Sequence, residues 1–100
     1  MLEYFMHQIC DELHGAIDYA KMAVEYKTAR PAWAKMYLDM SNAEANHATN
    51  LYKMCDEYYK NAISSYTEPP KYMKKCWDDI VEEYTEKFAK ARNIQEMYNR

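Results

Sequence analysis

A chain of 100 residues with a formal net charge of −3 has the length of one small domain. Its mildly acidic balance lacks the clustered Lys and Arg that bind nucleic-acid phosphates, and no apolar run approaches membrane-spanning length. Hydrophobic residues at 49 % exclude a disordered composition, and one Gly with three Pro favours a few long helices, hence an all-α fold. A domain this small buries a modest fraction of its surface, so we expect a partner subunit.

The first predicted helix runs from about Leu2 to Thr28. Its apolar residues recur at helical spacing and form a stripe wide enough to face two neighbours. The stripe consists of Phe5, Ile9, Ala16, Tyr19, Ala23 and Tyr26, flanked by Leu2, Met6, Leu13, Ile17, Ala20 and Val24. On the central line of this stripe only Glu12 is charged.

The second predicted helix begins at Pro31 and runs to about Ala62. Proline suits a first helical turn, and it disfavours helix in the residue before it, so 28–31 reads as a tight connection. One line of residues spaced alternately by four and three is typical of a helical bundle. We call this line the second-helix seam; it consists of Trp33, Tyr37, Met40, Glu44, His47, Leu51, Met54 and Tyr58.

A linker at 63–70 contains Pro69 and Pro70, which cannot continue a helix. A third helix is predicted from Lys71 to about Tyr98, so the chain divides into a hairpin at 1–62, the linker, and a third helix within 71–100. Its apolar face consists of Met73, Cys76, Trp77, Ile80, Tyr84, Phe88, Ala91 and Ile94. Its acidic residues are predicted to form a solvated face, namely Asp78, Asp79, Glu82, Glu83 and Glu86.

Three ionisable residues are predicted to meet between the first two helices. Glu44 and His47 are three positions apart and therefore project from one face of their helix. The short connection makes the two helices antiparallel neighbours. The midpoint between Glu12 and this pair falls at about residue 29, so all three lie at one height, about 25 Å from the turn.

Carboxylates in an apolar interface are costly unless something compensates their charge. Lys and Arg lie off these two lines, which favours a bound dication as the counter-charge. Two Glu and one His suit iron, manganese or zinc better than calcium or copper. The alternatives are a structural Glu–His hydrogen bond, or a face that opens toward solvent.

The stretch 12–20, from Glu12 through Tyr19 to Ala20, followed by Glu44-x-x-His47, resembles the first half of a rubrerythrin in the ferritin-like superfamily. In that superfamily a four-helix bundle supplies one Glu from each of two helices and a Glu-x-x-His from each of the other two. The resemblance implies that Glu12 and His47 are terminal ligands and Glu44 a bridging ligand of a diiron site. Tyr19 and Tyr37, one heptad from the two Glu residues, would donate hydrogen bonds to the ligands.

No His follows His47, so the chain carries half of such a ligand set. Its helix order and single half-motif are similar to those of the encapsulated ferritins, in which two hairpin protomers complete one ferroxidase centre. This likeness implies a homodimer, or a higher homo-oligomer, that shares a dinuclear iron site and uses O₂ or peroxide; Mn or Zn are possible substitutes. A C-terminal targeting segment is not evident in 93–100.

The sequence therefore leaves three functions open: a ferroxidase, a metal-free helical protein–protein interaction module, and a rubrerythrin-like peroxidase. The last lacks a rubredoxin-type cysteine set, because Cys10, Cys55 and Cys76 have no paired spacing. We expect these to be reduced thiols in a cytoplasmic protein without a signal peptide. His7 and His14 lie off the line of Glu12 and are predicted to be surface residues.

Overall fold

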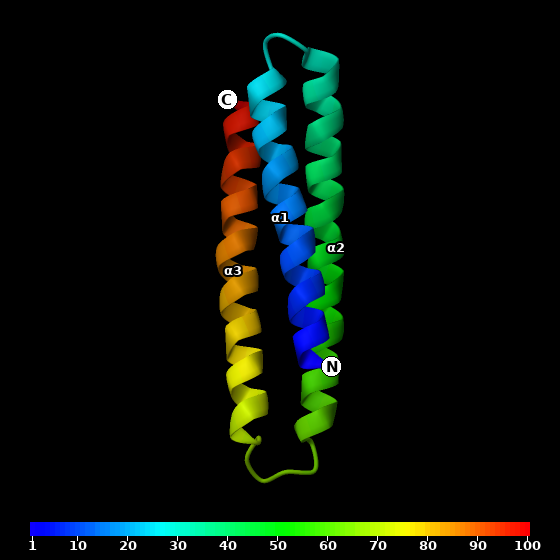
Figure 1. Cartoon of the computed structure of the whole chain (residues 1–100), viewed down its shortest axis with the longest axis vertical. Helices are drawn as coiled ribbons and strands as arrows, with labels where there is room; N and C mark the ends of the chain where they lie inside the picture. The colour runs from blue at the N-terminus through cyan, green and yellow to red at the C-terminus, as the bar shows by residue number, and fades with distance from the viewer.

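The computed structural model describes residues 1–100 and contains three α-helices and no strand. They are α1 (Leu2–Tyr26), α2 (Pro31–Ile63) and α3 (Lys71–Asn99). The helices run alongside one another and form a rod measuring 57 × 17 × 16 Å (Figure 1). The predicted all-helical class and the three helices are confirmed. The ends differ slightly: α1 ends two residues before Thr28, and α2 and α3 each end one residue later than expected.

The helix ends follow from the proline positions. Pro31 occupies the first turn of α2, where the missing N–H of proline breaks no hydrogen bond. The Arg30 N–H donates to the Tyr26 carbonyl at 2.8 Å, which closes the turn between α1 and α2. Pro70 precedes α3, and its carbonyl accepts the Lys74 N–H at 3.0 Å. The short first connection makes α1 and α2 an antiparallel hairpin.

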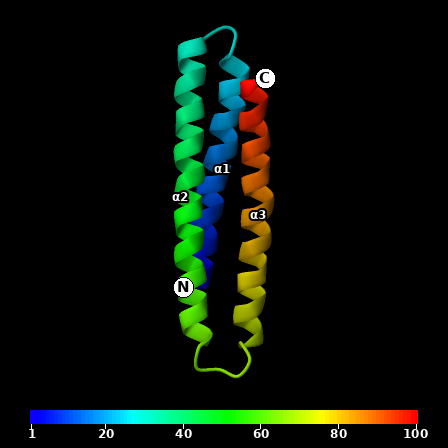
Figure 2. The same ribbon diagram turned by 180° about the vertical axis from the view of Figure 1, so that it is seen from behind.

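α1 is the central helix of the molecule. It packs along both α2 and α3, whereas α2 and α3 touch each other less (Figures 1 and 2). Because α1 packs against two helices, its apolar stripe must be wide enough to contact both of them. Its buried residues are Leu2, Phe5, Ile9, Leu13, Ala16, Ile17, Ala20 and Ala23.

A stack of aromatic rings joins α2 to α3. Tyr52 lies face to face with Tyr84, with ring centroids 4.1 Å apart, and Trp77 stacks on both Tyr52 and Tyr59 at 5.6 and 5.2 Å. The Tyr84 hydroxyl also lies 2.9 Å from the Thr49 hydroxyl, within hydrogen-bonding distance. Stacked aromatic pairs add about 0.5–1.5 kcal/mol each beyond the area they bury. The aromatic residues of this interface are therefore packing residues.

A polar cluster fixes α3 near the other end of the molecule. The Ser41 hydroxyl donates to the Ala16 carbonyl and accepts a hydrogen bond from the Gln95 amide at 2.8 Å. Arg92 donates to the side chains of Gln95 and Asn42. Ser41 and Gln95 are both buried, so their polar groups are satisfied by one another.

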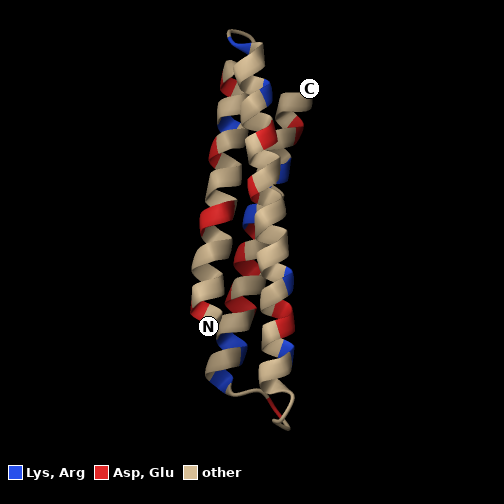
Figure 3. Ribbon diagram, turned by 90° about the vertical axis from the view of Figure 1, so that its right-hand side faces the viewer, with Lys and Arg blue, Asp and Glu red and all other residues tan.

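Charged residues of both signs are spread along the helices (Figure 3). Several form exposed pairs four residues apart, such as Lys74 with Asp78 and Lys75 with Asp79. Such pairs contribute about 0.3–0.5 kcal/mol each, so they favour solubility more than stability. None of the helices combines the length and the apolar character needed to span a bilayer.

The second-helix seam lies mostly outside the core, which differs from the expectation that it packs inside the hairpin. Trp33, Met40 and Met54 are 50 %, 41 % and 55 % exposed. The buried face of α2 is rotated away from them and consists of Ala34, Leu38, Ser41, Ala45, Ala48, Cys55 and Tyr59. The cause is the position of α3, which covers the opposite side of the hairpin. We call the uncovered side of the hairpin the open face; on α2 it includes Trp33, Met40, His47 and Met54.

Candidate metal centre

Glu12, Glu44 and His47 meet in the structure. Glu12 comes from α1, and Glu44 and His47 come from one face of α2. One oxygen or nitrogen atom of each lies within 4.8 Å of the other two. The Nδ1 atom of His47 is 3.4 Å from Oε2 of Glu12. The antiparallel register, set by the short turn, thus brings together residues more than thirty positions apart.

The cluster lies on the open face rather than in the interior. The His47 side chain is 56 % exposed, and that of Glu12 is 28 % exposed. At 3.6 residues per turn, the α3 contacts of Asn42 and Thr49 fall on the side of α2 nearly opposite His47. The sequence placed all three residues in the interior because periodicity shows which residues share a face and not which neighbour covers it.

Gly15 shapes the pocket for Glu44. A Cβ atom added at Gly15 would lie 3.1 Å from Oε2 of Glu44 and 3.4 Å from its Cδ. The chain has one glycine, and it sits inside α1 three residues after Glu12, although glycine costs about 0.5–1 kcal/mol relative to Ala there. The missing side chain lets the Glu44 carboxylate lie against the α1 backbone. Sequence reasoning overlooked this residue, although a lone glycine inside a helix is a recognisable signal.

The carboxylates of the cluster lack a compensating charge. Oε2 of Glu12 is buried and has no hydrogen-bond partner, and the contact with His47 falls short of a hydrogen bond. No Lys or Arg forms an ion pair with either carboxylate. The close approach of the Glu12 carboxyl, together with partial burial, raises the pKa of the Glu44 carboxyl. A buried, unpaired carboxylate oxygen is expensive, and a cation beside it would remove that cost.

Tyr19 and Tyr37 form an aromatic wall on the side of the cluster nearer the α1–α2 turn. Their rings stack at 6.0 Å, and Tyr37 also stacks on Tyr26 at 6.0 Å. Neither hydroxyl is hydrogen-bonded to Glu12 or Glu44 in this structure. Their role as donors to the ligands therefore stays a prediction.

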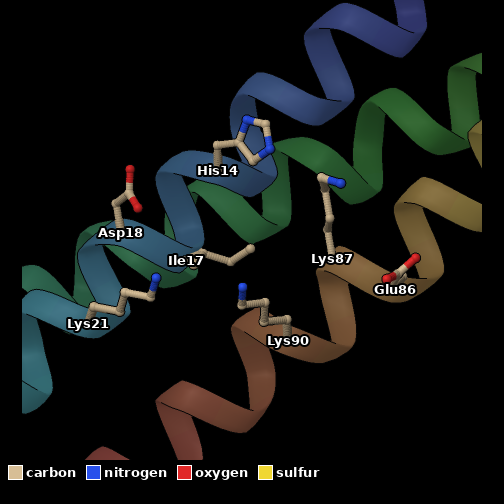
Figure 4. Close-up of a pocket in the computed structure, with 7 residues that line it drawn as sticks. All are labelled: His14, Ile17, Asp18, Lys21, Glu86, Lys87 and Lys90. Atoms are coloured by element: carbon tan, nitrogen blue, oxygen red, sulfur yellow. The ribbon is translucent and has the colours of Figure 1, made fainter.

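A second polar hollow lies between α1 and α3, on the side away from this cluster. It is lined by His14, Asp18, Lys21, Glu86, Lys87 and Lys90 around Ile17. Figure 4 shows the Lys21 and Lys90 side chains extending toward each other across the space between the helices. This hollow has more basic than acidic side chains. None of its residues belongs to the cluster of Glu12, Glu44 and His47. His14 and His7 are both exposed, as predicted.

The three cysteines are free thiols with different environments. Cys55 is fully buried, whereas Cys10 and Cys76 are half-buried. Burial raises the pKa of Cys55 to about 11. None belongs to the cluster of Glu12, Glu44 and His47.

Comparison with known proteins identifies the family of this chain. The sequence model of the rubrerythrin family matches residues 4–100, which includes α3 as well as the hairpin. No curated protein and no solved structure matches the chain. Because the family match spans nearly the whole chain, the chain belongs to the rubrerythrin family, a branch of the ferritin-like superfamily whose members typically bind diiron centres.

Proposed function

We propose that this protein oxidises Fe²⁺ for iron storage or detoxification, at a dinuclear site that two copies of the chain build together. The observation that carries the proposal is the convergence of Glu12, Glu44 and His47 around a buried carboxylate oxygen that nothing else in the chain satisfies. The family adds iron as the expected metal in general.

The residues present fit iron chemically. Two carboxylates and one imidazole are a hard-to-borderline donor set, which suits Fe²⁺ and also Mn²⁺ or Zn²⁺. In this proposal Glu12 and His47 are terminal ligands, and Glu44 bridges. Gly15 holds open the space in which the Glu44 carboxylate can turn toward Glu12.

Fe²⁺ is the substrate of the proposed reaction. Two Fe²⁺ ions give up two electrons, and O₂ takes them up with two protons to leave as hydrogen peroxide. The carboxylates would hold both ions close together and stabilise the more positive Fe³⁺ products. The aromatic wall of Tyr19 and Tyr37 would limit water on one side of the site.

A second copy supplies what one chain lacks. A two-fold interface duplicates every ligand, so two half-sets give four carboxylates and two imidazoles. The ligands lie on a face with exposed Trp33, Met40 and Met54, and exposed apolar groups of this kind favour association. This arrangement is the one we infer by likeness to the encapsulated ferritins.

The test is O₂ uptake after Fe²⁺ addition under defined buffer. We expect uptake in proportion to protein, lost in Glu44→Ala because the bridging carboxylate is gone. Glu57→Ala is the matched control, since Glu57 is an exposed glutamate on the same helix, and it should keep full uptake. If both variants and the parent behave alike, the ferroxidase proposal is wrong.

The open face also favours a second candidate, a metal-free interaction module. It predicts a protein that associates through the same apolar residues with no dependence on metal. A third candidate, a peroxidase, predicts that hydrogen peroxide is consumed faster than O₂ by the Fe²⁺-loaded protein. Running the uptake assay with each oxidant separates these candidates.

A further inference from the structure

A group of sulfur, imidazole and carboxylate side chains lies between α1 and α3, away from the candidate iron ligands. At 3.6 residues per turn, Cys10 projects about 160° around α1 from Glu12. None of the group belongs to the cluster of Glu12, Glu44 and His47. The side chains line an open hollow of about 490 Å³, with Met6, His7 and Cys10 on α1 and Asp79, Glu82 and Glu83 on α3.

Two sulfur atoms lie side by side in this hollow. The Sγ atom of Cys10 is 3.9 Å from the Sδ atom of Met6, which is four positions earlier on the same helix. The same Sγ atom is 4.0 Å from Oε2 of Glu83 on α3. Metal-bound sulfur lies about 2.3 Å from its ion, so two ligands at an angle near 120° are about 4.0 Å apart. Both separations are therefore those of two ligands that share one ion.

His7 is the nitrogen donor of the hollow. It precedes Cys10 by three positions, so the two side chains project from one face of α1. His7 is exposed, and its ring can turn toward the sulfur atoms by rotation about its own side-chain bonds. Thiolate and thioether sulfur are soft ligands that select Cu(I), and imidazole suits copper as well. Zinc sites use Cys, His and carboxylates, so the thioether of Met6 is the donor that favours Cu(I).

We propose that Met6, His7 and Cys10 bind one Cu(I) ion at a site separate from the iron ligands. The Cys10 thiol would release its proton to solvent on binding, because the thiolate is the form that ligates metals. The single negative charge of the thiolate then balances the single positive charge of Cu(I). Glu83 is already paired with Lys87, so a divalent ion would have to draw this carboxylate away from its ammonium partner. A monovalent ion leaves that pair intact.

The test is transfer of Cu(I) from its coloured bicinchoninate complex to the full chain, with thiols reduced and oxygen excluded. We expect the parent to take up one Cu(I) per chain. Cys10→Ala should lower the affinity about 100-fold, and Met6→Leu, which keeps the side-chain volume, about 10-fold or more. The matched control for Met6→Leu is Met54→Leu, at an exposed methionine on α2, which should keep the parent affinity.

His7 is tested in the same way. His7→Gln should weaken Cu(I) binding about 10-fold or more, because the imidazole ligand is lost. His14→Gln is the matched control, since His14 is an exposed histidine of α1 that lines a different hollow. Circular dichroism of each variant shows that the helices are retained.

Three results would overturn the proposal. A parent that takes up no Cu(I), or a Met6→Leu variant with unchanged affinity, would mean that the two sulfur atoms only pack against each other. A loss in Cys76→Ala as large as that in Cys10→Ala would place the ion in the neighbouring hollow beside Cys76. A loss in Glu44→Ala would place it at the iron ligands.

The copper site and the proposed iron site can fail independently. Glu44→Ala should bind Cu(I) as the parent does, because Glu44 lies on the other side of α1 from the hollow. Cys10→Ala should keep the O₂ uptake that follows Fe²⁺ addition. Absence of that uptake from the parent would contradict the ferroxidase proposal alone.

Discussion

Gly15 lies next to Glu44 in the candidate metal centre. It is a glycine inside a helix, where glycine is an unfavourable residue. Glycine lowers helix stability, yet a Cβ at this position would come 3.1 Å from the Glu44 carboxylate. The carboxylate is the far end of a flexible side chain, so it can swing aside. Gly15 therefore affects where Glu44 points more than whether the protein folds.

This gives two opposite expectations for Gly15→Ala. The free energy of unfolding of the metal-free protein should rise by about 0.5–1 kcal/mol, because the helix loses its glycine. Affinity for Fe²⁺ should fall by about 10-fold or more, as is typical when a group that orients a ligand is disturbed. Urea unfolding and anaerobic Fe²⁺ titration measure the two effects. In a Glu44→Ala background the same change should only stabilise; unaltered metal affinity in the parent background would count against a positioning role.

Cys55 is the thiol most altered by its surroundings. Its pKa rises from an ordinary value of 9.0 to about 11 because it is buried, so the folded protein holds this proton more tightly than the unfolded chain. The resulting stability is present below pH 9 and is lost as pH rises from 9 toward 11. The loss attributable to Cys55 should reach about 2–3 kcal/mol.

Comparison of unfolding curves for the parent and Cys55→Ala across this pH range isolates that contribution. The parent should lose more stability than the variant above pH 9, and parallel curves would refute the assignment. Thiol labelling at neutral pH provides a second measurement. Cys10 and Cys76, which are half-buried, should react well before Cys55.

At the scale of elements, α3 determines which face of the hairpin stays open. The polar cluster around Ser41 and the aromatic stack around Tyr52 and Tyr84 both lie on the α3 side. Their positions commit α3 to that side and leave the side of Glu44 and His47 free. The exposure of the candidate metal ligands therefore depends on α3 contacts in which none of them takes part.

Ser41→Ala tests this attachment. The change removes the acceptor of the buried Gln95 amide and the donor to the Ala16 carbonyl, and a buried group left unpaired costs about 1–3 kcal/mol. We expect a loss of that size in the free energy of urea unfolding. Ser65→Ala, in the exposed linker, should change it by less than about 0.5 kcal/mol. Equal effects of the two substitutions would mean that the cluster does not hold α3.

Helical spacing predicted the common height of the three candidate ligands. It did not predict which face of α2 is exposed, nor the role of Gly15. The common height of Glu12, Glu44 and His47 follows from their distances to the turn at Pro31, which sequence supplies directly. The outward position of Trp33 does not, because a seam of apolar residues looks the same whether it is covered by its own chain or by another. Gly15 acts through one side-chain contact between two helices, which spacing alone does not specify.

At the scale of the whole molecule, the three helices form a rod with one apolar face uncovered and three candidate metal ligands near its middle. The chain belongs to a family whose members typically bind diiron centres, so these three residues are candidate iron ligands. A second copy of the chain would complete the ligand set. The ligands and the apolar face then serve one purpose, because closing the face also assembles the site. Metal binding and dimerisation should therefore strengthen each other.

The most direct test is iron content measured together with molar mass, by metal analysis of the light-scattering peak after anaerobic Fe²⁺ loading. We expect a dimer that carries about two iron ions, that is about one per chain. Glu12→Ala and Glu44→Ala should each elute with almost no iron, while Glu57→Ala should match the parent. A monomer without iron, or a dimer whose iron content is unchanged by Glu44→Ala, would show that Glu12, Glu44 and His47 do not form a shared iron site.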